Sequence, residues 1–145
     1  MDIRTLTAFG SMALGVLLVI ASVATWIMVS TTLADQRITT PDDAVCLADT
    51  RVNGPFSAYC QATTIDRNVL EITEGQTYAE LDREDPRRDT AQSASFLQAS
   101  LFTSILAFGV SAMAFGMGVL FFLIGLGIRD VNSRLDAAME PRASV

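Results

Sequence analysis

The chain has 145 residues, is 50% hydrophobic and carries a formal net charge of −6, and it contains neither histidine nor lysine. Those two absences exclude Ser-His-Asp and Cys-His catalysis, histidine-ligated zinc, haem or iron, and Schiff-base chemistry. Two cysteines are too few for a Cys₄ zinc site, and no glycine-rich phosphate loop is present. We therefore predict no catalytic residue, no metal site and no cofactor.

The first 34 residues predict a transmembrane helix. No charge occurs from Thr5 to Ala34, and the continuous apolar part from Leu6 to Val29 would measure about 36 Å as a helix. Trp26 lies near its end, where an indole anchors at the membrane boundary. A cleaved signal peptide is the alternative, with a small-x-small site at Ser22 to Thr25. The long apolar stretch behind a single arginine favours a retained helix.

A polar loop follows over residues 35–89 and carries twelve acidic residues and six arginines. Helix-start signals occur twice in its first half. Thr40 and Pro41, followed by two aspartates, predict an N-cap and first turn. The Asn53-Gly54 turn before Pro55 predicts the start of a second helix.

The second half of the loop holds a capping-box pattern and a charge cluster. Thr77 and Glu80 in "TYAEL" have the spacing of a capping box. Asp85 and Pro86 predict the start of the long helix that follows. The alternating charges of "ELDREDPRRD" are more typical of mutual ion pairs than of a cation site.

Residues 90–129 predict one long helix that begins in water and spans the membrane from about residue 101. No charge occurs from Thr90 to Ile128, and Arg129 ends the insertion as an interface anchor. Residues 130–145 form the predicted tail. Together the two apolar segments indicate an all-α membrane hairpin.

The two cysteines, Cys46 and Cys60, indicate a disulfide in an oxidising compartment. A bridge closing this loop of ~15 residues would stabilise it by about 3 kcal/mol. A redox-active pair is the alternative, but low-pKa cysteines need cationic neighbours and neither cysteine has one in sequence.

Topology follows mainly from the cysteines. Arginines flank the spans on both sides, so the positive-inside rule discriminates weakly. The predicted disulfide places loop 35–89 outside the cell and both termini in the cytoplasm. The protein is therefore predicted to be a multi-pass protein of the plasma membrane.

Small residues in both apolar segments predict close helix packing. One set packs within the chain, which leaves a second stripe for another integral membrane protein or a second copy. The predicted partners are thus these proteins and the lipid bilayer, with no nucleic acid. The small-residue pairs are Ser11 with Gly15, Ala112 with Gly116 (extended by Gly109), and Ala114 with Gly118.

Three stretches, "ITTPDDAVCLADTRVNGPFSAYCQA", "TYAEL" and "ASFLQASLFTSILAFGVSAMAFGMGVLFFLIG", resemble a family of small two-span actinobacterial membrane proteins of unestablished function. The resemblance implies two spans with an outside loop. That family is often labelled "aromatic ring-opening dioxygenase", a label that this histidine-free chain contradicts. Cys46 and Cys60 stand where the family has small residues, and the stretch between Leu81 and Ala94 is shorter.

These features favour a non-enzymatic accessory or scaffold protein of the cell envelope. A homo-oligomeric channel is the alternative, although neither span carries a charged filter. A membrane-bound enzyme using Glu71 or Glu80 as acid or base is the third interpretation.

Overall fold

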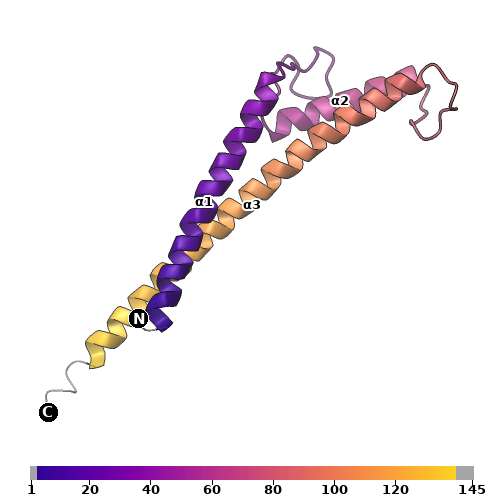
Figure 1. Ribbon diagram of the computed structural model, residues 1–145. Coiled ribbons are helices and arrows are strands. Elements are labelled where there is room, and N and C mark those ends of the chain that lie inside the picture. Colours follow the sequence, from indigo (N-terminus) through magenta and orange to yellow (C-terminus); the bar gives the residue numbers. More distant parts are fainter. Residues whose placement is uncertain (1–2, 140–145) are drawn as a thin grey trace. The chain divides into compact units, whose positions relative to one another are not determined.

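The computed structural model describes residues 3–139, and within that range it contains three helices and no strand (Figure 1). Helix α1 covers Ile3–Asp35, α2 covers Pro55–Ile72 and α3 covers Arg88–Met139. Helices α1 and α3 are long and apolar enough to cross a membrane. The predicted all-helical class with two long apolar helices is therefore confirmed.

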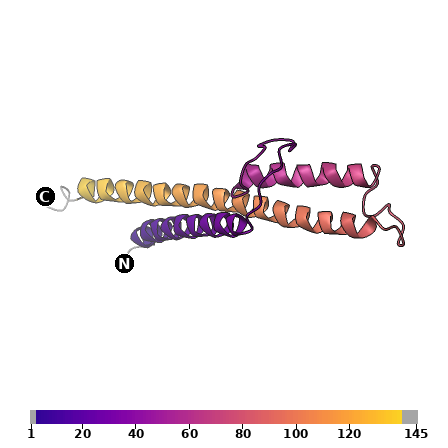
Figure 2. The same cartoon turned by 90° about the horizontal axis from the view of Figure 1, so that it is seen from above.

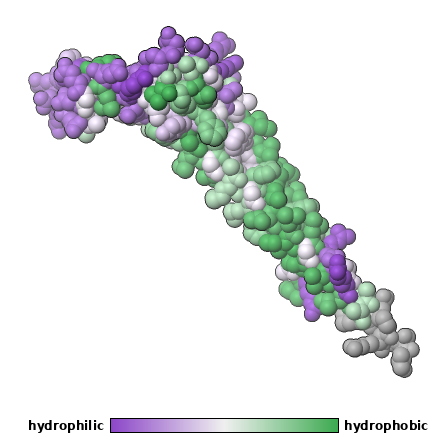
Figure 3. All heavy atoms as spheres, turned by 180° about the vertical axis from the view of Figure 1, so that it is seen from behind, coloured by the Kyte–Doolittle hydropathy of each residue, from purple (hydrophilic) through white to green (hydrophobic). Residues whose placement is uncertain are grey.

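The chain divides into two compact units. The helix-pair unit consists of Met1–Thr25 and Val110–Val145, and the head unit consists of Trp26–Gly109. The head unit thus contains the end of α1, all of α2 and the beginning of α3. On the face drawn in Figure 3, hydrophilic residues gather on the head unit and hydrophobic residues cover most of the helix-pair unit.

Glycines bring α1 and α3 into backbone contact in the helix-pair unit. A Cβ added at Gly15 would lie 2.6 Å from the Gly118 carbonyl oxygen and 2.6 Å from the Phe122 nitrogen. A Cβ at Gly125 would lie 2.8 Å from the Ala8 carbonyl oxygen. Only hydrogen fits at these positions, so the glycines set how closely the two helices approach.

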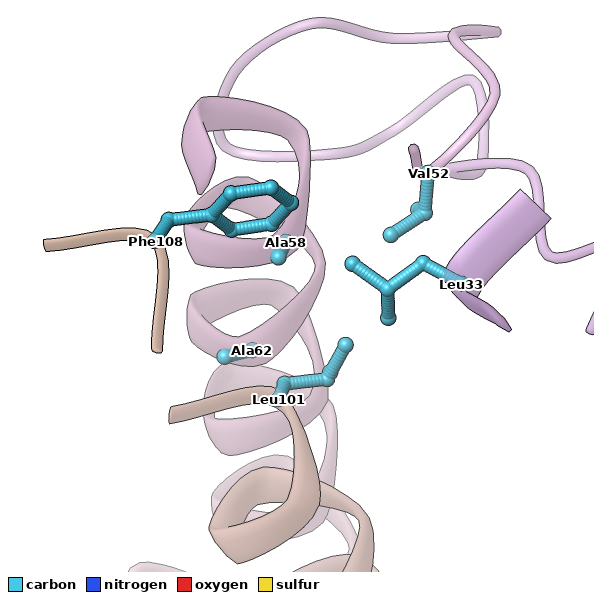
Figure 4. Close-up of a cluster of buried hydrophobic side chains, with 6 residues drawn as sticks. All are labelled: Leu33, Val52, Ala58, Ala62, Leu101 and Phe108. Carbon is cyan, nitrogen blue, oxygen red and sulfur yellow. The ribbon is translucent and has the colours of Figure 1, made fainter. Parts of the chain in front are cut away.

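A small apolar cluster holds the head unit together (Figure 4). The cluster joins Leu33 of α1 to the first part of α3. It also joins both of these to α2, whose fully buried members of the cluster are two alanines. Because alanine is small, α2 can lie alongside the first part of α3 (Figure 2). The members are Leu33, Val52, Ala58, Ala62, Leu101 and Phe108.

The predicted helix at Pro41 is wrong. Residues 38–52 instead form an irregular hairpin, with an isolated antiparallel bridge between Thr39 and Arg51. The reason lies in Thr40, which is 1% exposed and does not cap a helix. Its hydroxyl donates to the Leu47 carbonyl and accepts from the Thr50 amide at 2.9 Å, so it ties the two arms of the hairpin together.

The start signals at Pro55 and Asp85 are confirmed. Gly54 is the N-cap of α2 and Pro55 its first residue, and the Ser57 hydroxyl accepts from the Gly54 amide at 3.2 Å. Before α3, the Asp85 carboxylate accepts from the Arg87 amide at 2.8 Å. Only half of the predicted Thr77–Glu80 capping box forms: the Glu80 carboxylate accepts from the Thr77 amide, whereas the Glu80 amide donates to the Thr77 carbonyl oxygen at 3.0 Å. The segment is a single turn and not a helix.

Helix α3 is longer than predicted. It begins at Arg88 and continues without a break to Met139, whereas the sequence predicts that the long helix ends at residue 129 and that Asp130 to Met139 form a separate short tail helix. The extension contains neither glycine nor proline, and an Arg134–Asp130 ion pair of 3.0 Å spans one helical turn. Residues 140–145 of the predicted tail lie outside the described residues.

The glycine contact predicts that Gly15→Ala destabilises the helix pair. Because the added methyl group would meet backbone atoms that cannot swing away, we expect a loss of roughly 1–3 kcal/mol. Thermal unfolding of the full chain in detergent measures this loss. Gly10→Ala is the matched control, since nothing lies within 4 Å of a Cβ at Gly10. Equal melting temperatures for the two variants would contradict the contact.

Candidate functional site

A disulfide between Cys46 and Cys60 fastens the hairpin to α2. The two Cα atoms are 5.4 Å apart, and Cys60 is 4% exposed on the buried face of the helix. Next to it, the Val45 amide donates to the Thr64 hydroxyl at 3.2 Å. The predicted disulfide is confirmed, and it acts here as a covalent clamp between a loop and a helix.

An arginine adds a polar attachment beside the disulfide. Nη2 of Arg67 donates to the Asp43 carbonyl oxygen at 2.6 Å and lies 3.2 Å from the Asp43 carboxylate. Glu71 is 3.9 Å from the same guanidinium group. Residues 43–46 of the hairpin are therefore held to α2 by one covalent bond and several polar contacts.

The two carboxylates considered as acid or base take part in local structure. Glu71 belongs to the Arg67 cluster just described. Glu80 accepts from both the amide and the hydroxyl of Thr77 at 2.8 Å. These hydrogen bonds, that of the amide first, lower the pKa of Glu80 below its ordinary value. A lowered pKa suits a structural cap, whereas a general acid requires a raised one.

One ion pair forms within "ELDREDPRRD", where the sequence predicts mutual pairing, and its arginine also reaches Glu74 outside that stretch. Nη2 of Arg87 lies 2.9 Å from the Asp85 carboxylate and Nη1 lies 3.5 Å from that of Glu74. Hydrogen bonds from Arg87 lower the pKa of Asp85, and the same contact raises the pKa of Arg87. The Arg88 guanidinium lies 4.3 Å from the centre of the Tyr78 ring. The cluster orders the entry into α3.

The small residues named from the sequence separate into two groups. Gly15 and Gly118 lie at the contact between α1 and α3, and Ser11 and Ala114 are half-buried. The second group is exposed, and a Cβ at either of its glycines would meet nothing within 4 Å. This exposed stripe consists of Gly109, Ala112 and Gly116.

The two predicted interface anchors are both exposed. Trp26 retains 40% of its surface and packs edge-on against Phe108, with ring centroids 4.7 Å apart. Arg129 is exposed on α3 and makes no ion pair with any described residue.

Within residues 3–139, no group of three or more histidine, cysteine, aspartate or glutamate side chains could hold a metal ion. Comparison of the chain with protein-family models, curated proteins and solved structures finds no match.

Three features of the structure escaped the sequence analysis. Gly125 makes a helix contact as close as that of Gly118, and its seven-residue spacing from Gly118 was the available signal. Thr40 organises the hairpin through contacts that only folding brings about. Finally, the aromatic residues of α2, Phe56 and Tyr59, lie on its exposed face.

Opening the disulfide is predicted to loosen the head unit and leave the helix pair unchanged. The bridge closes a loop with a sequence separation of 14 residues. Its loss should lower the opening free energy of the hairpin by about 3 kcal/mol. Hydrogen exchange of the reduced chain should therefore accelerate in residues 38–64 and not in residues 3–25. A reduced Cys46→Ser variant is the control, because reductant should change it no further. Uniform acceleration along the chain would contradict a local clamp.

The lowered pKa of Asp85 predicts a pH-dependent first turn in α3. A depressed folded-state pKa contributes stability above the unfolded pKa, and this contribution is lost as the pH falls through the folded value. Amide exchange at Arg88 and Ala91, corrected for intrinsic rate, should thus accelerate only below about pH 4. Asp85→Asn should remove this dependence. Asp82→Asn is the control, since that side chain pairs with no described residue. An unchanged pH profile in Asp85→Asn would refute the assignment.

Proposed function

We propose that this protein is a non-enzymatic membrane accessory or scaffold protein. In this proposal α1 and α3 form a membrane hairpin with both termini in the cytoplasm. The head unit lies outside the cell, and the hairpin associates with other membrane helices through the exposed stripe. The family of small two-span actinobacterial proteins that the sequence resembles would share this architecture.

Insertion in a membrane is supported by the exposure of the two apolar helices. Only 11% of the most apolar window of α1 and 17% of that of α3 are buried. The core helix of a soluble protein would be mostly buried, and exposed apolar surface of this extent needs lipid or protein to cover it. The Gly15 contact also supports a retained α1, because a cleaved signal peptide would leave the matching face of α3 empty.

The outside position of the head unit is supported by its disulfide. Disulfides persist in oxidising compartments and are rare in the cytosol. The head also has a small core and depends on this covalent clamp, as is typical of small extracytoplasmic domains.

The single observation that carries the scaffold proposal is the uncovered stripe of Gly109, Ala112 and Gly116. Small residues allow helix backbones to approach closely, and such packing drives helix association in lipid. The chain's own α1 uses the other small-residue face, which contains Gly118. The exposed stripe thus remains available for a helix from another chain.

A crosslinking experiment tests this proposal. A photoreactive phenylalanine introduced at Met113, which is 61% exposed and follows Gly109 by four residues on α3, should crosslink in intact cells to an integral membrane protein or to a second copy. Gly116→Leu should reduce the yield about tenfold, which corresponds to 1.4 kcal/mol of lost association energy. The reason is that the leucine side chain holds the two backbones apart.

Met117→Leu is the matched control. Met117 adjoins Gly116 at the same depth but lies on a different face of α3, and it is 45% exposed. The crosslink should survive this substitution. Crosslinking to lipid alone, or equal yields in the two variants, would refute association through the stripe.

A further inference from the structure

Two aromatic side chains at the start of α2 are exposed. Phe56 retains 80% of its surface and Tyr59 retains 52%. They are three residues apart, so they lie on the same face of the helix. The buried face is formed instead by small residues such as Ser57, Ala58 and Cys60. A pair of exposed aromatic residues on one helix face suits contact with lipid or with another protein.

Contacts within the head unit place this pair close to the level of Trp26. The Ser30 hydroxyl donates to the Asn53 carbonyl oxygen at 2.7 Å, directly before α2 begins. Ser30 is four residues from Trp26 on α1, which is about 6 Å along the helix axis. Phe108, which packs on Trp26, belongs to the same cluster as Ala58 (Figure 4). The first turn of α2 therefore lies within about one helical turn of the tryptophan.

The charge pattern singles out the same end of the helix. No charged residue occurs between Arg51 and Asp66, although loop 35–89 as a whole carries eighteen charges. Along the exposed face of α2, Phe56 and Tyr59 are followed by Thr63 and then by Asp66. Farther along, Asp66 accepts from Gln98 Nε2 at 2.9 Å. The exposed face thus changes from aromatic to charged with distance from Trp26.

We propose that the first two turns of α2 lie in the headgroup layer of the membrane, with Phe56 and Tyr59 inserted among the lipids. This inference rests on the proposed membrane insertion of α1 and α3. An aromatic ring with a polar tip is favoured at this depth, and Trp26 marks the depth on α1. The head unit is then held to the bilayer surface by α2 as well as by the two spans.

Lipid fits this face better than a protein partner does. A bilayer surrounds the level of Trp26 on all sides, and the aromatic pair lies at that level. The charge-free stretch of α2 is also the part of the helix nearest to Trp26. Charged residues begin farther along α2, where a helix that leaves the headgroup layer would meet water. A second copy or another protein would need no such alignment with the tryptophan.

Depth-dependent fluorescence quenching tests the inference. Trp26 is the chain's only tryptophan, so Trp26→Phe combined with Phe56→Trp moves the single indole to α2. The full chain is reconstituted in phosphatidylcholine vesicles whose acyl chains are brominated near the headgroup end. We expect the indole at position 56 to lose as much intensity to these lipids as Trp26 does in the unmodified chain, and to resist aqueous iodide.

The matched control places the indole in the charged part of the head unit. Phe96 is 66% exposed and lies two residues from Gln98, which contacts Asp66. Phe96→Trp in the same Trp26→Phe background should be quenched by iodide and not by brominated lipid. Phe56 and Phe96 are largely exposed, and the shared Trp26→Phe substitution keeps an aromatic ring beside Phe108.

The other possible outcomes distinguish failure of the interfacial position of α2 from failure of membrane insertion. If Trp26 is quenched by brominated lipid and position 56 is quenched only by iodide, the interfacial position of α2 is refuted and membrane insertion stands. If position 56 resists both quenchers, a second copy of the chain covers it, and the lipid assignment is again overturned. If brominated lipid does not quench Trp26 in the unmodified chain, membrane insertion itself fails.

Discussion

The close approach of two helix backbones at glycine residues is the constraint on which the helix-pair unit depends. Between apolar helices in lipid, the hydrophobic effect supplies no net attraction, because lipid tails are as apolar as the side chains. Attraction must then come from many short contacts, which require small residues. Gly15, Gly118 and Gly125 provide them, and each would place a Cβ under 3 Å from a neighbouring backbone atom. The same requirement explains why an exposed stripe of small residues on α3 suggests another helix.

The head unit is stabilised by a different kind of contact. Its core is small, and α2 contributes only Ala58 and Ala62 to the apolar cluster. Stability must therefore come from specific attachments as well as from buried area. The disulfide fastens the hairpin to α2, the Thr40 hydroxyl closes the hairpin, and Nη2 of Arg51 donates to the Ala34 carbonyl oxygen at 2.8 Å at the end of α1. These attachments connect the hairpin to two helices.

Several polar groups of the head unit stabilise its own structure. Arg67 binds the hairpin, Arg87 binds Asp85, and Glu80 caps a turn. Exposed apolar or aromatic surface occurs along α1 and α3 and at the start of α2. Surfaces of this kind suit association with lipid and with other helices, which is the basis of both proposals made above.

Sequence by itself determined the helix class, the two long apolar segments, the cysteine pair and the starts of α2 and α3. These features follow from local rules: charge-free length, proline and cap positions, and cysteine count. The form of residues 38–52 depends on tertiary contacts. There the hydrogen bonds that Thr40 makes across the hairpin outweigh its local capping signal. Only the tertiary structure decided which small residues meet and which remain exposed, and it turned Phe56 and Tyr59 outward. Such outcomes depend on which surfaces come together in space, and helical periodicity alone does not specify them.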